Sequence, residues 1–387
     1  MKVTYITYDS NAILSNSGKS GVIKKIFAQL SALQKLGVCS ELVIMHRYLP
    51  ANLPEGSKMR FIEARTAPYK NIWEKIRSST DIAEAIGKEI KSSDGNAVIY
   101  IRGLLPTPKM VRALRKRRKC LVVFELQSFV EREAALRSSW ETVFAMKLFY
   151  GKVLRYADGI VGVTNEIALH YFKMSKRRNL RYLVNGNGID VESVPLREPP
   201  VFDKKNLDLL CVAQVAKWHG LDRLIRGMAE YKGNVDVRLH IAGDGSEVPN
   251  LKRLVADLEL ENSVVFHGFK TGKELDSFFD KCHIAVSSLA IHRAGAGSPL
   301  KSKEYCARGI PFVDSTTDED FDPQFEFRMK IRSEENPINM EQIVEFAGRV
   351  LRDSDHHEKM RKYAIERLDW SIKMKRLKDF FEEIVRS

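Results

Sequence analysis

The feature that most constrains the fold is an alternation of strand-like and helix-like segments, which runs through the first half of the chain and begins again in the second. In the first half, short β-rich runs occur at residues 3–7, 41–45, 97–101, 120–124 and 159–163. Helical stretches lie between them, and the clearest, 22–36, repeats its apolar residues at helical spacing and ends before Gly37. Such alternation predicts a parallel sheet covered by helices on both faces.

The second half repeats this pattern. Strands are predicted at 207–213, 237–242, 264–266 and 284–287, and helices at 221–231, 248–258 and 273–280. Pro195, Pro199 and Pro200 separate the halves and indicate a linker. The sequence therefore predicts two Rossmann-like α/β domains, 1–195 and 196–368, followed by a last segment, 369–387. Ligands of such sheets bind beyond the carboxyl ends of the strands, which predicts an active site in a cleft between the two domains.

Several protein classes are excluded by the composition. The chain has 387 residues, of which 44% are hydrophobic and 29% charged, so it has enough apolar material for two cores. No apolar run approaches the roughly 20 residues that a membrane-spanning helix needs. The opening MKVTYITYDSN does not have the pattern of a secretory signal. Five widely separated cysteines with no CxxC pair argue against a disulfide scaffold and indicate a reducing, cytoplasmic setting.

The positive charge is confined to one half. Residues 1–195 carry 32 basic and 17 acidic side chains, whereas residues 196–387 carry 31 and 33. The basic residues are densest at 112–119 and 173–181, and neither run has the interleaved aromatic residues or the motif that nucleic-acid binding requires. A phosphorylated substrate is an alternative, but we expect an anionic membrane surface to be the partner. Leu136, Trp140, Phe144, Leu148 and Phe149 share a predicted helix and are expected in the core rather than in the lipid.

Other motifs are incomplete. Gly18-Lys-Ser20 is similar to the end of a Walker A loop, but Ile13 stands where that loop needs glycine. What remains is a loop with Gly18 that enters a helix at Gly21, where free backbone N–H groups can face an anion. No protease motif is present, and the nine scattered histidines give no zinc pattern. The acidic run Asp318–Asp320 is interpreted as a solvated loop rather than a metal site.

The most specific motif is the segment 297–313. A loop of Gly297, Ser298 and Pro299 enters a helix at Leu300. The free backbone N–H groups of this loop and of the helix start could bind a diphosphate. Glu304 lies about one turn further along and could accept hydrogen bonds from both hydroxyls of a ribose.

With this segment in place, the chain resembles the retaining nucleotide-sugar glycosyltransferases of the GT-B fold, the group 1 family that builds bacterial surface polysaccharides. The resemblance extends over nearly the whole chain, because its motifs occur in the family's order: the glycine loop and helix at 18–36, Asn185–Asp190, 212–225, His240–Gly245, 265–268, 299–311, and Asp369-Trp-Ser before a last helix. It implies two parallel sheets facing a central cleft, an N-terminal acceptor domain, a C-terminal donor domain, and a last helix, 369–387, that crosses back to the first domain.

The resemblance also implies roles for particular residues. Glu304 would contact the nucleotide and Gly243 would lie in its binding loop. Where the family has a second glutamate, eight positions before Glu304, this chain has Ala296. The family's basic pair aligns with Gln214 and His219, which leaves Lys217, His219 if protonated, and Lys301 to stabilise the leaving diphosphate. Gln127 stands where many members have a histidine, and we assign it to the catalytic group as well.

The predicted function is therefore transfer of a sugar from a nucleotide-sugar donor to a lipid-linked glycan acceptor, with retention and without a metal, on the inner face of the cell membrane. Two alternatives remain open. One is a non-catalytic GT-B subunit, favoured by Ala296 and Gln127, and the other is a sugar-nucleotide epimerase on the same fold.

Overall fold

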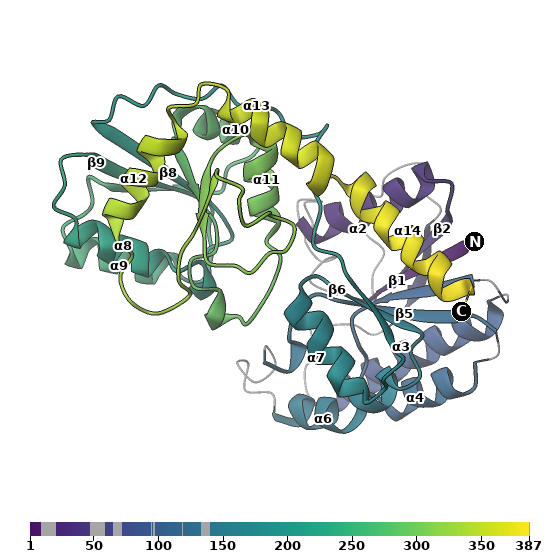
Figure 1. Cartoon of the computed structure of the whole chain (residues 1–387). Coiled ribbons are helices and arrows are strands. Elements are labelled where there is room, and N and C mark those ends of the chain that lie inside the picture. Colours follow the sequence, from purple (N-terminus) through teal and green to yellow (C-terminus); the bar gives the residue numbers. More distant parts are fainter. Residues whose placement is uncertain are drawn as a thin grey trace. The chain divides into compact units, whose positions relative to one another are not determined.

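A computed structural model describes residues 1–8, 21–46, 59–64, 72–93, 95, 97–117, 119–132 and 140–386, and these form two compact units (Figure 1). Unit 1 comprises Met1–Gly186 together with Trp370–Ser387, and unit 2 comprises Asn187–Asp369. The chain therefore passes from one unit to the other twice.

Unit 1 is built on a seven-stranded parallel sheet in the order β3-β2-β1-β4-β5-β6-β7. Its strands are β1 (Lys2–Thr7), β2 (Cys39–His46), β3 (Met59–Glu63), β4 (Ala97–Arg102), β5 (Leu121–Leu126), β6 (Gly159–Gly162) and β7 (Arg181–Val184). Every residue of β4 is buried, as expected for a central parallel strand with helices on both faces.

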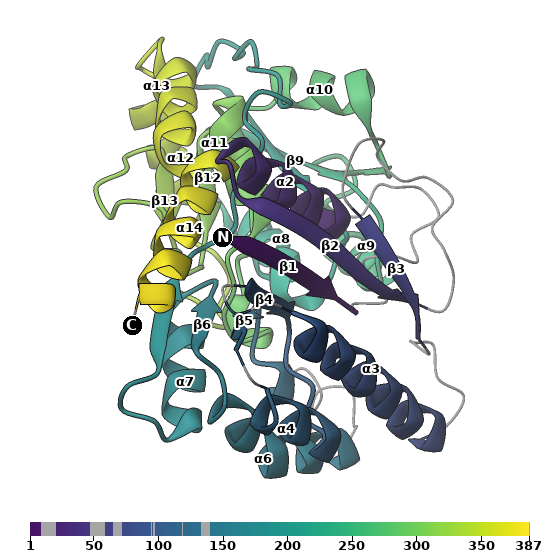
Figure 2. The same cartoon turned by 90° about the vertical axis from the view of Figure 1, so that its right-hand side faces the viewer.

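Helices cover both faces of this sheet (Figure 2). On one face, α14 (Trp370–Arg386) packs against α2 (Gly21–Lys35), and Lys378 Nζ donates to the Leu36 carbonyl at 3.2 Å. On the other face lie α3 (Ile72–Ser92), α4 (Pro108–Arg115), α6 (Trp140–Leu154) and α7 (Asn165–Ser175), each packed against the next. Threonine side chains cap two of them: Thr107 accepts from the Met110 N–H, and Thr164 accepts from the Ile167 N–H.

Unit 2 has a six-stranded parallel sheet in the order β10-β9-β8-β11-β12-β13. Its strands are β8 (Asn206–Val212), β9 (Asp236–Ala242), β10 (Val264–Gly268), β11 (Ile284–Val286), β12 (Phe312–Asp314) and β13 (Arg328–Lys330). The helical segments are η1 (Lys217–His219), α8 (Leu221–Glu230), α9 (Val248–Asp257), α10 (Gly272–Lys281), η2 (Ile291–Arg293), α11 (Leu300–Arg308), α12 (Met340–Val350), α13 (His356–Tyr363) and η3 (Ala364–Leu368). The predicted pair of parallel α/β sheets is thus confirmed.

The first boundary between the units falls after Gly186, nine residues before the predicted one at 195. The intervening residues pack in unit 2 because Val191 and Val194 belong to its hydrophobic core. Ile189 also forms an isolated β-bridge with Asp369, whose carboxylate accepts from the Val191 N–H at 3.2 Å. Residues 187–194, assigned from the sequence to the first domain, and Asp369, assigned to the last segment, are therefore tied together within unit 2.

Gly243 follows β9 where two loops approach closely. Its φ is +151°, and a Cβ built there would lie 1.8 Å from the Ala213 carbonyl oxygen. The Ala213 N–H donates to the Ala242 carbonyl at 3.2 Å, and the Val215 N–H donates to the Asp244 carbonyl at 2.8 Å. This backbone contact, rather than a ligand, is sufficient to require glycine at this position.

We expect Gly243→Ala to lower the free energy of unfolding of unit 2 by about 2–3 kcal/mol, because backbone on both sides must shift to admit the methyl group. Denaturant unfolding of the full chain measures this loss. Gly297→Ala is the control, since a Cβ at Gly297 meets no atom within 4 Å. Equal losses in the two variants would contradict the steric argument.

Within the described ranges, no helix combines the length and apolarity needed to cross a bilayer.

Candidate functional site

The predicted diphosphate-binding residues lie on two segments of unit 2 that leave neighbouring strands. Segment η1 follows β8, and α11 follows β11 by way of η2. Since β8 and β11 are paired and parallel, both segments start from the same edge of the sheet. Hydrogen bonds join them: the Leu289 and Ala290 N–H groups donate to the carbonyls of His219 and Trp218.

Among the described residues, no side-chain cap binds the first N–H groups of helix α11. Pro299 is its N-cap residue, with extended backbone, and no side-chain cap bond is present. Gly297 precedes it with open space where a side chain would be. The backbone donors near Pro299 and Leu300 can therefore face an anion, together with the positive end of the helix dipole.

The side chain of Lys301 brings a positive charge to this helix start. Its Nζ is buried and has no hydrogen-bond partner among the described residues. Burial lowers the pKa of Lys301 to about 8, although Cys211 and Asp314 act in the opposite direction. The ammonium form still dominates at pH 7, so an unpaired cation is held ready for a ligand with negative charge.

His219 lies near Lys301 but is not a cation. Its Nδ1 accepts a hydrogen bond from the Ala216 N–H at 3.0 Å, which places the ring proton on Nε2. Burial, followed by the charge of Lys301, lowers its pKa to about 2. The condition under which His219 would act as a cation is therefore not met, because water is excluded from the ring, and its part in catalysis stays a prediction. A neutral Nε2–H can still donate one hydrogen bond.

Lys217, two residues before His219, is exposed. Its carbonyl accepts from Arg293 Nη1 at 2.9 Å, and Arg293 also pairs with Asp222 and Glu335. No carboxylate among the described residues pairs with the Lys217 ammonium. Arg223, by contrast, is buried and donates to the carbonyls of Leu289, Asn336 and Arg332, so its role in the structure is to hold loops.

Ser298 is engaged inside unit 2. Its hydroxyl donates to Asp318 Oδ2 at 3.1 Å and accepts from the Asn187 N–H at 3.1 Å. Asp318 in turn accepts from Lys303 Nζ, at 2.7 Å to Oδ1, and Asp320 accepts from the same ammonium at 3.1 Å. The interpretation of 318–320 as a solvated loop is wrong: Asp318 is 4% exposed and Lys303 is fully buried, because helix α11 supplies their counter-charge.

Glu304, the predicted ribose ligand, is half-buried on α11. Its Oε1 accepts from Arg308 Nε at 2.9 Å, and Arg308 also donates to Asp276 at 2.8 Å. No donor among the described residues reaches Oε2. One carboxylate oxygen is thus fixed by the neighbouring arginine and the other is available to hydroxyl groups; its contact with ribose stays a prediction.

Gln127 follows β5 in unit 1, and its amide is oriented by a lysine that the sequence did not single out. Lys25 Nζ donates to Gln127 Oε1 at 2.6 Å, while the buried Gln127 Nε2 has no hydrogen-bond partner among the described residues. Lys25 also pairs with Glu125 at 3.2 Å, and Glu125 accepts from Tyr5 and Gln29.

The charges in this cluster depend on one another. Burial lowers the pKa of Lys25 to about 7, although Glu125 beside it has the opposite effect. Burial alone would raise the pKa of Glu125, but Lys25 and Arg102 hold it at about 2. A helical pattern with a lysine on its buried face, as in α2, is the signal that could have revealed Lys25.

The remaining predicted positions carry less information. Gly18 lies outside the described residues, and Gly21 is the first residue of α2. No group of three or more His, Cys, Asp or Glu side chains within the described ranges is arranged to hold a metal ion.

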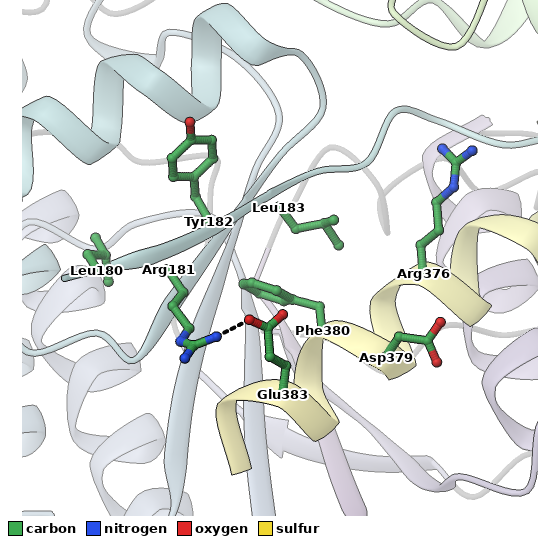
Figure 3. Close-up of a pocket in the computed structure, with 8 residues that line it drawn as sticks. All are labelled: Leu180, Arg181, Tyr182, Leu183, Arg376, Asp379, Phe380 and Glu383. Carbon is green, nitrogen blue, oxygen red and sulfur yellow. Dashed lines mark hydrogen bonds and ion pairs between the residues drawn. The ribbon is translucent and has the colours of Figure 1, made fainter. Parts of the chain in front are cut away.

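A groove of about 530 Å³ opens elsewhere on unit 1, between β7 and α14 (Figure 3). Phe380 contributes its ring to it, and Arg181 pairs with Glu383 across it. None of the predicted site residues lines this groove.

Comparison with known proteins locates the chain among the glycosyltransferases. Residues 195–367 match the family model described as "Glycosyl transferases group 1". A comparison with curated proteins by sequence finds no match.

Solved structures match over the whole length. Sucrose-phosphate synthase from Thermosynechococcus elongatus has a TM-score of 0.69 at 14% identity, with 100% of this chain and 99% of that one covered. The lipopolysaccharide outer core galactosyltransferase WaaB has 0.66 at 15%, with 99% and 100% covered. Anabaena HepE, solved with UDP-glucose, has 0.63 at 15%, also with 99% and 100% covered. The segment 195–367 is thus a group 1 glycosyl transferase domain, the two units together have the GT-B fold, and the protein is a glycosyltransferase.

Proposed function

We propose that the protein transfers a sugar from a nucleotide-sugar donor to a lipid-linked saccharide acceptor in bacterial surface polysaccharide synthesis. The observation that carries the proposal is the unpaired, buried ammonium of Lys301 beside the uncapped start of α11. When the bond between the sugar and the diphosphate breaks, negative charge grows on the leaving group, and fixed donors there lower the barrier. Two of the similar structures, HepE and a pneumococcal O-GlcNAc transferase, were solved with UDP, which supports a nucleotide as part of the donor.

The finer parts of the proposal have separate supports. Metal independence is supported by the chain's own cations, Lys301 and the exposed Lys217, which can neutralise a diphosphate. Retention at the anomeric carbon is carried over from the resemblance to the family. Placement at the cytoplasmic face of the membrane is supported by the charge of unit 1: it carries 37 basic and 18 acidic side chains, whereas unit 2 carries 26 and 32.

Nucleotide release, measured with and without a lipid-linked acceptor, tests the proposal. Release that depends on acceptor supports a transferase, and NMR of the product's anomeric proton then reports retention. Isomerised donor without acceptor would instead identify an epimerase. Tight nucleotide binding with no turnover would identify a non-catalytic subunit, which Ala296 favours. Unchanged turnover in a chelator supports metal independence, and a thermal-shift screen of nucleoside diphosphates identifies the base.

We expect Glu304→Gln to weaken donor binding by about 1–3 kcal/mol, because a ribose hydroxyl loses its charged acceptor. Calorimetric titration with the nucleoside diphosphate measures the change. Asp276→Asn is the matched control, since it removes the other carboxylate partner of Arg308 and leaves Glu304 in place. A loss of the same size in both variants would show that Arg308, not the ribose, accounts for the effect.

A further inference from the structure

Helix α6 presents apolar side chains to solvent. Trp140, Phe144 and Leu148 are 71%, 64% and 44% exposed, and they are spaced four residues apart, so they form one stripe along the helix. The opposite side of the same helix is buried, with Met146, Tyr150 and Val153 in the core. The expectation that the apolar residues of this helix are core is therefore wrong for these three, which we call the α6 stripe. Phe149 is half-buried, and Leu136 lies outside the described residues.

Basic side chains lie on α6 itself and at the ends of its two neighbouring helices. Helix α6 lies between α4 and α7, whose ends carry the two basic runs (Figures 1 and 2). Both runs are fastened to the loop after α6: Arg117 pairs with Asp158 at 2.5 Å, and Arg177 donates to the Ala157 carbonyl at 2.5 Å. Exposed cations are present on all three helices and just beyond them, among them Arg115, Lys116, Lys147, Lys152, Lys173 and Lys176.

The α6 stripe begins near one particular edge of the sheet. Strands β5 and β6 are parallel, so α6, which connects them, runs from the carboxyl edge of the sheet back to the amino edge. Trp140, in the first turn, is therefore at the end of α6 nearer the carboxyl edge, where β5 leads into Gln127. A surface that contacts the stripe would lie beside the edge at which an acceptor is expected.

This combination fits one kind of partner better than others. Tryptophan, phenylalanine and leucine beside lysine and arginine are the side chains that enter the headgroup region of an anionic bilayer. A second copy of this chain would bring the same positive surface against itself, which like charges oppose. We propose that the α6 stripe inserts into an anionic membrane while the exposed cations of α6 and of the neighbouring helix ends contact its headgroups. This rests on the proposed function only in its purpose, which is to bring the enzyme to a lipid-linked acceptor.

The test is co-sedimentation of the full chain with phosphatidylcholine vesicles, with and without phosphatidylglycerol, at low and high salt. The wild type should bind the anionic vesicles and should retain part of this binding at high salt, because salt screens the charges but not apolar insertion. Replacement of Trp140, Phe144 and Leu148 with serine should weaken binding about tenfold or more at low salt and abolish it at high salt. The matched control replaces Val201, Phe269 and Ile365, which are exposed apolar residues of unit 2, and should bind as the wild type does.

Other outcomes overturn the inference. If the stripe variant binds vesicles as the wild type does at both salt concentrations, the cations act alone. If the wild type forms dimers that the variant loses, and neither binds vesicles, the stripe is an interface between copies. Transfer to a water-soluble acceptor is measured in parallel and should be equal in wild type and variant. If the stripe variant loses vesicle binding but the wild type transfers no sugar to any acceptor, the proposed function is rejected. The membrane-binding role of the α6 stripe is then still supported.

Discussion

Replacing Lys303 with methionine should lower the free energy of unfolding by about 3–5 kcal/mol, because it removes the buried ammonium that pairs with two carboxylates of unit 2. Lys303 Nζ lies 2.7 Å from Asp318 and 3.1 Å from Asp320, and 4.4 Å from the centre of the Phe321 ring. Burial would lower the pKa of Lys303, but the two aspartates raise it above its ordinary value, so the ammonium stays charged. Denaturant unfolding, followed by far-UV circular dichroism, measures the loss.

Lys359→Met is the matched control. Lys359 also forms an ion pair, at 2.6 Å from Asp353, but its side chain is 56% exposed. An exposed pair of this kind contributes at most about 1 kcal/mol. If the two methionine variants lose the same free energy of unfolding, burial does not explain the contribution of the Lys303 cluster to stability. Since Asp318 also holds Ser298, the Lys303 variant should in addition bind nucleotide more weakly.

Lys301→Met should lower turnover about 10²–10³-fold while it weakens donor binding much less, because the charge that Lys301 faces grows in the transition state. The pH dependence gives an independent check. With a pKa of about 8, the lysine loses its proton as the pH rises through that value, so wild-type turnover should fall on the alkaline side. Steady-state kinetics across this range measure both effects.

Lys301→Arg keeps its charge at every pH used and serves as the control. Its turnover should be reduced by the altered geometry but should no longer fall near pH 8. Wild-type turnover that stays constant above pH 8, or a methionine variant with full turnover, would move the role to Lys217 or to a cation of unit 1.

The fold could be predicted because parallel sheets leave a strong periodic signal. The predicted runs at 97–101 and 237–242 differ from β4 and β9 by a single residue at one end. Strand β4 is buried on both faces and is nearly continuous in apolar residues, whereas β9 alternates buried apolar with more exposed polar residues along most of its length. Strand β7 was missed because Arg181 and Tyr182 do not look apolar, although pairing with β6 orders them. Edge strands are fixed by their partners more than by their own residues.

The site was less predictable because charge states depend on burial. His219 could be assigned as a cation or as a neutral donor from its sequence alone, and only enclosure by the fold decides for the neutral form. Asp318 and Lys303 are fifteen positions apart, and an acidic run gives no sign that a lysine on a helix reaches it. The α6 stripe was expected in the core but is exposed. Apolar residues at helical spacing look the same in the sequence whether the fold covers that helix face or leaves it to solvent.

The double passage of the chain between its units affects the order in which the protein can fold during synthesis. Unit 1 needs α14, which the ribosome makes only after all of unit 2. Without it, Phe381, which packs against Tyr100, and Phe380 and Ile384, which lie over Gly159, are missing from the first core. Unit 2, by contrast, is continuous in sequence and has every residue it needs once Asp369 has emerged. Domains usually form in the order of synthesis; here the first unit to begin is the last that can be completed.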